Sequence, residues 1–229
     1  MPYGLICTFL GVFFGGLLGH ILRRFVSDTL RDMLPRLLGL TAICNGLLSI
    51  MKVQSMPVVT LAILVGGWLG IVLRLEERVC HAFGIVLRRV PRPADFDMEQ
   101  YITVAAILCT SGFGLYAVMV ESFNGDHAQM FSKAMMDCFA AFIFGSGMDI
   151  SVSLIALPQG AILISFFLLA KVLMPIMSEA MLLNFIACGG ALTIAAGMRM
   201  AKIRAYPIID MLPALALVLV LTPLHELLL

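Results

Sequence analysis

The sequence predicts an all-α fold, a polytopic transmembrane helical bundle of about eight spans that forms a single integral membrane domain, 1–229. Three observations carry this prediction. Only 13% of the 229 residues are charged and 61% are hydrophobic, which argues against a surface that faces water. Several apolar runs approach the roughly 20 residues that cross a bilayer. Lysines and arginines gather in alternate gaps between these runs, as in multi-pass membrane proteins.

Eight apolar segments follow from the length of a membrane-crossing helix. They are 3–22, 36–51, 57–75, 102–121, 130–147, 150–170, 180–198 and 207–227. Glycine and proline interrupt the fourth to sixth segments, which predicts broken helices there. No proper loop separates segments five and six, so they either cross fully or form a re-entrant hairpin.

The basic residues of the gaps give the orientation. Gaps one, three and seven hold twelve of the fifteen Lys and Arg residues, whereas the other four gaps together hold three. Because cytoplasmic loops retain basic residues, we expect both termini outside the cytoplasm. The polar stretch from Arg74 to Gln100 begins with an amphipathic piece, which either lies on the inner leaflet or extends segment three.

Composition also narrows the function classes. A net charge of +1 argues against a nucleic-acid partner, which requires a large basic field. The six cysteines are scattered singly, without the spacing of a zinc site, and no Ser/His/Asp or Glu/His set is placed for hydrolysis. We therefore expect a protein that is not an enzyme and has no cofactor and no metal, with the lipid bilayer as a partner.

Glycines recur at helical spacing in the first and third segments. Gly11, Gly15 and Gly19 form one stripe, and Gly66 and Gly70 repeat part of it. A helix face without side chains lets another helix backbone approach closely. We expect helix packing at these positions, either within the chain or across a homo-oligomer, for which a dimer is favoured.

Asp137 is the one carboxylate that lies clearly within a predicted span, and Lys133 lies one turn before it. An ionised side chain at the bilayer centre costs about 2.5–3.5 kcal/mol, so such residues usually face a cavity or a partner. One interpretation is that Asp137 binds or relays a cation or a proton. The other is an intrahelical pair with Lys133 that snorkels to the outer surface.

Segment four is interrupted near its middle by Thr110, Ser111, Gly112, Phe113 and Gly114. Two glycines so close together permit local unwinding, which would turn backbone carbonyls toward a bound ion. Alternatively, the glycines only let helices cross closely.

Two further interruptions lie at Gly145 to Asp149 and at Leu157 to Gly160. A half-helix over 150–157 would point its N-terminal amides at whatever lies beside Asp149, and Gln159 would line the same pathway. Alternatively, Asp149 or Ser151 caps span six at the inner surface.

A polar stripe follows segment two, where Thr41, Asn45 and Ser49 recur at every fourth residue. Asn184 of segment seven is a candidate partner for it. These groups either form interhelical hydrogen bonds or make the wall of a hydrophilic pathway.

Several motifs carry a resemblance to a known family. They are Lys133-Ala-Met-Met-Asp137, the stretch 147–153, Gly189-Gly190, Gly197-Met-Arg199 and Asp210-Met-Leu-Pro213-Ala-Leu. At these positions the chain is similar, nearly end to end, to the uncharacterised bacterial inner-membrane proteins typified by YqgA and YdfK, the domain of unknown function 554. The resemblance implies a polytopic fold in the bacterial inner (cytoplasmic) membrane and a role in transport. It does not indicate which substrate is transported. Asp210 stands where that family usually has an asparagine, so it either joins the site or only caps a helix.

Together these features predict a transport protein that moves a small ion or small solute through a polar pathway, with cation coupling at Asp137. A passive ion channel and a non-transporting membrane scaffold or regulator are the alternatives. Transport predicts that polar groups of several spans converge in one wet cavity, whereas a scaffold predicts that they pair in dry helix contacts. The predicted pathway residues are Asp137, Lys133, Thr110, Ser111, Gly112, Gly114, Asn45, Thr41, Asp149 and Gln159.

Overall fold

The protein is a bundle of helices. A computed structural model describes residues 3–87, 101, 104, 105, 108, 109, 112–148 and 150–228. Every element in these residues is helical: α1 (Tyr3–Ile21), α2 (Asp28–Ile50), α3 (Met56–Leu73), α4 (Leu75–Leu87), α6 (Gly112–Asn124), α7 (Ala128–Gly147), the 3-10 helix η1 (Ile150–Ile155), α8 (Ala156–Leu173), the 3-10 helix η2 (Met174–Ile176), α9 (Glu179–Met200) and α10 (Pro213–Leu228).

Five helical stretches in the described residues are long and apolar enough to cross a membrane. They are α1, α2, α3, α9 and the continuous run Ile150–Leu173 formed by η1 and α8. The predicted all-α transmembrane class is therefore confirmed, and the number of eight spans stays a prediction. α7 has 20 residues but is too polar to be one of the five.

Four helices begin and end within two residues of the predicted segments, and α2 is the clearest exception. It begins at Asp28 and continues through Pro35, whereas the sequence prediction started after that proline. The side chain of Ser27 accepts a hydrogen bond from the Leu30 amide and Asp28 lies in the first turn. Both stabilise a helix N-terminus, which explains why the helix starts before the proline.

The predicted break around Pro158 lies slightly earlier in the chain. η1 ends at Ile155, α8 begins at Ala156, and Pro158 falls in the first turn of α8. A proline is tolerated there because the N–H groups of a first helical turn have no intrahelical partner. The change of helix type therefore precedes the proline instead of coinciding with it.

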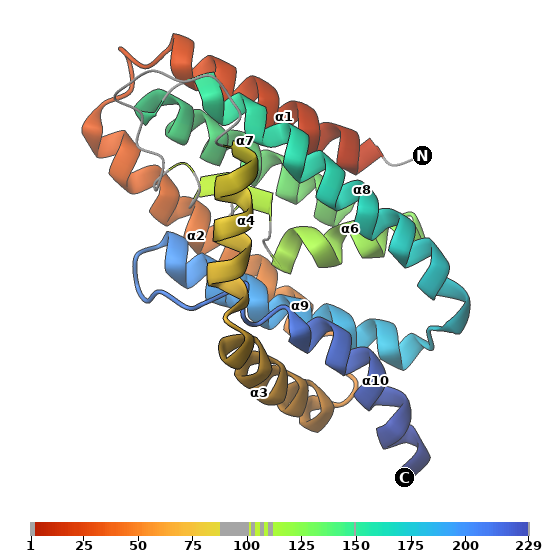
Figure 1. Cartoon of the computed structure of the whole chain (residues 1–229). Helices are drawn as coiled ribbons and strands as arrows, with labels where there is room; N and C mark the ends of the chain where they lie inside the picture. Colours follow the sequence, from red (N-terminus) through yellow and green to blue (C-terminus); the bar gives the residue numbers. More distant parts are fainter. Residues whose placement is uncertain are drawn as a thin grey trace.

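The glycine stripe of α1 packs against α7, and the two helices run parallel (Figure 1). A Cβ atom at Gly11, Gly15 or Gly19 would meet the backbone of this helix. The contacted residues are Ala134, Cys138 and Phe142, in that order. The constant spacing between the two series shows that α1 and α7 stay in register along most of α1.

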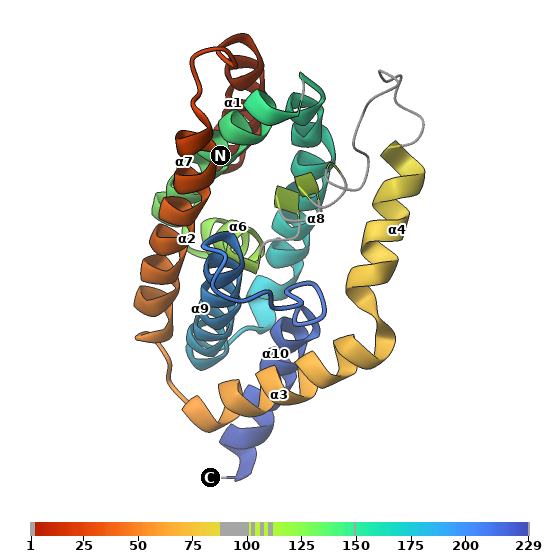
Figure 2. The same ribbon diagram turned by 90° about the vertical axis from the view of Figure 1, so that its left-hand side faces the viewer.

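Antiparallel glycine contacts join α2 to α9 and α3 to α10. α2 packs on α9 with Gly39 against Gly197 and Gly46 against Gly190, and α3 packs with Gly66 against Ala214 of α10 and Gly70 against Asp210, just before α10. Figure 2 shows α4 leading away from α2 and α9, although its first turn is joined to the end of α9 by an ion pair between Glu76 and Arg199. The predicted packing role of the glycines in α1 and α3 is thus seen within the chain, and the predicted dimer stays untested.

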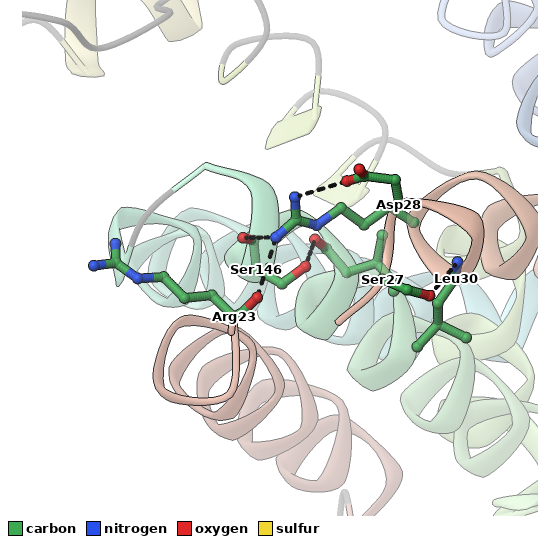
Figure 3. A network of polar contacts seen from close by, with 7 residues as sticks. Arg23, Ser27, Asp28, Leu30 and Ser146 are labelled. Atoms are coloured by element: carbon green, nitrogen blue, oxygen red, sulfur yellow. Dashed lines mark hydrogen bonds and ion pairs between the residues drawn. The ribbon is translucent and has the colours of Figure 1, made fainter. Parts of the chain in front are cut away.

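The three gaps rich in Lys and Arg meet at one end of the bundle. Arg31 donates to the carbonyl oxygens of Ser146 and Arg23 and contacts Asp28 (Figure 3). Asp32 pairs with Lys202 at 2.7 Å, so this end joins the start of α2 to the end of α9. A guanidinium beside the last carbonyls of α7 is favourable because a helix C-terminus carries partial negative charge.

The junction of α3 and α4 lies at this same end. Glu76 pairs with Arg199 at 2.8 Å, and its backbone N–H donates to Asp210 Oδ1 at 2.8 Å. Of the two roles left open for Asp210, the structure therefore shows that it caps a helix, namely α4.

Candidate functional site

The register of α1 against α7 sets the depth of the charged residues. It places Lys133 level with Leu10 and Asp137 level with Phe14, and these two positions flank the middle of α1. Since α1 is one of the helices long and apolar enough to cross a membrane, the charged residues of α7 lie near mid-depth of the bundle. Such a position is costly for an ionised group unless it has a partner.

Lys133 and Asp137 form a buried pair. The ammonium nitrogen is 2.5 Å from each carboxylate oxygen, and the two residues are 3% and 5% exposed. The intrahelical pair that the sequence suggested is present, but it does not reach the surface of the protein. Buried charges of this kind are expensive to separate because each would be left without a counter-ion.

Gln159 of α8 completes this cluster from a second helix. Its Nε2 atom donates to Asp137 Oδ2 at 2.5 Å and to the carbonyl oxygen of Leu108 at 3.2 Å. Gln159 is 1% exposed, and its Oε1 atom has no hydrogen-bond partner in the described part of the chain. Asp137 thus pairs with the Lys133 ammonium and with the Gln159 amide N–H, and Gln159 in turn contacts the carbonyl of Leu108.

The oxygen atoms of the Asp137 carboxylate, the Gln159 amide and the Leu108 carbonyl are hard ligands of the type that bind small cations. The cluster, which we call the α7 charge cluster, consists of Lys133, Asp137, Gln159 and the Leu108 carbonyl. In the present arrangement the positive charge beside Asp137 is the Lys133 ammonium. The backbone carbonyl of Leu108 has no sequence signal beyond the nearby glycine pair, which is why sequence reasoning did not name it.

The polar stripe of α2 is only partly brought to this cluster. Asn45 Nδ2 lies 3.9 Å from Met136 Sδ, next to Asp137 in the chain. Thr41 is exposed, and its hydroxyl donates to the carbonyl oxygen of Leu38 in its own helix. Ser49 likewise donates to the carbonyl oxygen of Asn45.

Asn184 does not pair with that stripe, and the expected partnership was wrong. Its side-chain oxygen accepts hydrogen bonds from the backbone N–H groups of Gln54 and Ser55, and its amide nitrogen donates to Thr222. Asn184 therefore holds the connection that leads into α3. No sequence signal indicated this role, because the groups that Asn184 binds here are backbone N–H groups far away in the chain.

The remaining predicted site residues lie elsewhere or outside the description. Gly112 is the first residue of α6, and Gly114 is buried. Thr110, Ser111 and Asp149 lie outside the described residues.

Glu121 of α6 is a second buried carboxylate, which sequence reasoning missed because segment four was predicted to end at this residue. It is 3% exposed because α6 continues to Asn124. Its Oε1 atom accepts from the Gly4 backbone N–H at 2.8 Å and lies 2.6 Å from His127 Nδ1. The apolar residues Val118 and Phe123 around it were the available signal of burial.

The helices and the buried ionisable groups define a class of protein, a multi-pass α-helical membrane protein with charged side chains inside its bundle. Comparison with known proteins then places it more closely. The chain belongs to the family described as protein of unknown function (DUF554), whose model matches residues 3–223.

Two relatives in this family are similar over nearly their whole length. The uncharacterized protein YqgA of Escherichia coli is 30% identical over 216 residues, which cover 92% of each chain. The uncharacterized membrane protein YdfK of Bacillus subtilis is 22% identical over 222 residues, which cover 93% of this chain and 92% of YdfK. No solved structure matches the chain significantly.

Proposed function

We propose that this protein moves a small ion or small solute across the bacterial inner membrane, and that Asp137 binds the cation or proton that drives or accompanies this movement. One observation supports the proposal above the others: the α7 charge cluster is buried near mid-depth of α1 and is built from α7, α8 and the carbonyl of Leu108. Ionisable groups at such depth are rare in membrane proteins and usually mark a pathway for ions or protons.

The chemistry of the cluster fits cation binding. Asp137 offers two oxygens, and Gln159 offers an amide oxygen that has no hydrogen-bond partner in the described residues. A cation that replaces the Lys133 ammonium would meet both oxygens of Asp137 without further desolvation of the carboxylate. Asn45 of α2 contacts Met136, the residue before Asp137 on α7. It would belong to the wall of the pathway.

A scaffold or regulator is the second candidate, and a specific observation favours it. Several polar groups outside the cluster are bonded to backbone within one helix: Thr41, Ser49 and Thr193 donate to carbonyls of their own helices. Transport and scaffolding therefore differ in the role of the α7 charge cluster, and the test must be made there.

Flux into proteoliposomes tests the proposal, with Na⁺, K⁺ and a proton gradient supplied in turn. The informative variant is Lys133→Met with Asp137→Asn, because removal of both charges leaves no stranded ion in the interior. We expect this double variant to fold and to lose flux almost completely.

Asp126→Asn is the matched control. Asp126 is exposed, and its side-chain oxygen accepts from the Ala128 N–H, a bond that asparagine keeps. Full flux in the double variant would remove Asp137 from the ion pathway. Flux in the wild type that is not coupled to any cation gradient would favour a passive channel, and no flux with any of the three would favour the scaffold.

A further inference from the structure

Glu121 carries an oxygen that its surroundings leave unbonded. Oε1 is held by the Gly4 amide and lies next to His127, whereas Oε2 is buried and has no hydrogen-bond partner in the residues that the structure describes. A buried carboxylate oxygen without a donor bears its desolvation cost without compensation. Its position is suited to a donor that is present only part of the time.

The carboxylate of Glu121 lies beside α7, at Met130, about one helical turn before Lys133. A Cβ atom at Gly4 would meet the Cβ of Met130 on α7 and both carboxylate oxygens of Glu121, the latter at 3.0 and 3.1 Å. Met130 and Lys133 are both buried and share a helix face, because residues three apart are neighbours on a helix. Along the axis they are separated by about 4.5 Å. Along α7, Lys133 therefore follows Met130, which lies beside Glu121, and precedes its partner Asp137.

The present direction of the Lys133 side chain is not the one that a helix favours. Cα–Cβ bonds tilt toward the helix N-terminus, and a lysine four residues before an acidic residue is a weaker pair than the reverse order. Lys133 nevertheless extends toward the C-terminus of α7 to reach Asp137. Its flexible four-carbon stem can also extend the other way, which is the direction of Glu121.

We propose that Glu121 is the second partner of Lys133. When a cation occupies Asp137, the ammonium moves to Oε2 of Glu121, and it returns when the cation leaves. The proposal rests on the proposed function for the identity of the trigger. It also fits a monovalent cation as ligand: with a neutral His127 beside Glu121, two carboxylates and one ammonium leave one negative charge for the cation to balance.

Thermal unfolding in detergent tests the second partner without any transport. In Asp137→Asn the ammonium has lost its present partner, so it should depend on Glu121. We expect Glu121→Gln to lower Tm at least twice as much in the Asp137→Asn background as in the wild type. Lys133→Met in the same chain should remove that extra loss, because no ammonium remains to be paired.

An equal loss of Tm in both backgrounds would overturn the proposal, since Glu121 would then only hold Gly4 and His127. Should Glu121→Gln fail to fold, the same cycle with Glu121→Asp, which draws the carboxylate back by one methylene, gives the same comparison. Stability coupling without any flux by the wild type would refute the proposed function alone. Flux without stability coupling would refute the second partner alone.

Salt-dependent unfolding tests the trigger. NaCl or KCl, compared with choline chloride at equal ionic strength, should raise the Tm of the wild type and of Asp126→Asn equally. In Glu121→Gln the displaced ammonium finds no carboxylate to pair with, only a neutral amide oxygen, so we expect less than half of that rise. The same rise in Glu121→Gln, or no rise in the wild type with either salt, would contradict the exchange of partners.

Discussion

Lys133 contacts both carboxylate oxygens of Asp137 from one turn earlier on α7, and both side chains are almost completely buried. The two charges thus depend on each other, since water reaches neither of them to any useful extent. Each substitution at this pair therefore has two effects, one on the chemistry of the site and one on the stability of the fold.

The stability effect can be predicted by itself. Lys133→Met alone leaves Asp137 as an unpaired buried charge and should destabilise the protein by about 3–5 kcal/mol. Adding Asp137→Asn should recover most of this loss, because both charges are then gone. Unfolding in denaturant, monitored for a protein in detergent, measures the difference. A double variant that is no more stable than Lys133→Met would show that the pair is not coupled.

Adjacent glycines of α3 offer a matched comparison of packing. A Cβ atom at Gly66 would collide with the backbone of Ala214, whereas nothing lies within 4 Å of one at Gly67. We expect Gly66→Ala to cost about 1–3 kcal/mol through overpacking. Gly67→Ala should be neutral or stabilise by up to about 1 kcal/mol, because alanine favours a helix more than glycine does.

Thermal unfolding of the two single variants checks this expectation. Similar Tm values for Gly66→Ala and Gly67→Ala would mean that α3 and α10 are farther apart than the structure shows. The glycine stripe of α1 can be tested in the same way, with a substitution away from the stripe as the control. Val12 is not suitable for this control, since it is completely buried. The half-exposed Phe14 serves better.

Asp210 should anchor the start of α4. Asp210→Ala removes the acceptor of the Glu76 N–H and should cost about 1 kcal/mol, the usual loss at a helix cap. Asp210→Asn keeps an acceptor and should be close to the wild type. Limited proteolysis within α4 measures the effect locally, and equal cleavage rates in both variants would refute the capping role.

The orientation in the membrane is open to direct labelling. Asp126 and Arg204 are exposed residues in the loops before α7 and after α9. In a background without native cysteines, Asp126→Cys should react with an impermeant thiol reagent from outside the cell, and Arg204→Cys only after the membrane is opened. This expectation follows from the basic gaps. The opposite pattern would invert the protein in the membrane.

Local sequence signals predicted the helices and the contact of Lys133 with Asp137, because both depend on residues within one or two turns. The glycine stripes predicted close packing, but not which helix would be the partner. The hydrogen bonds from Gln159 to Asp137 and from Gly4 to Glu121 join residues 22 and 117 positions apart. Such contacts are set by how helices assemble, which the periodicity of one helix does not encode.

Pro35 shows a different limit of sequence reasoning. A proline inside a helix removes one backbone hydrogen bond and usually ends the helix. Here the cap at Ser27 and the long contact of α2 with α9 outweigh that loss. The net result depends on tertiary packing, so the boundary of α2 was predicted eight residues too late.

The reciprocal glycine contact between α2 and α9 also has a consequence for biosynthesis. Gly190 and Gly197 are translated roughly 150 residues after Gly39 and Gly46, and at about 5–20 residues per second this takes on the order of ten to thirty seconds. During that interval the bare backbone face of α2 has entered the bilayer without its counterpart. A nascent chain therefore passes through a period in which this face of α2 lies in the membrane without its protein partner.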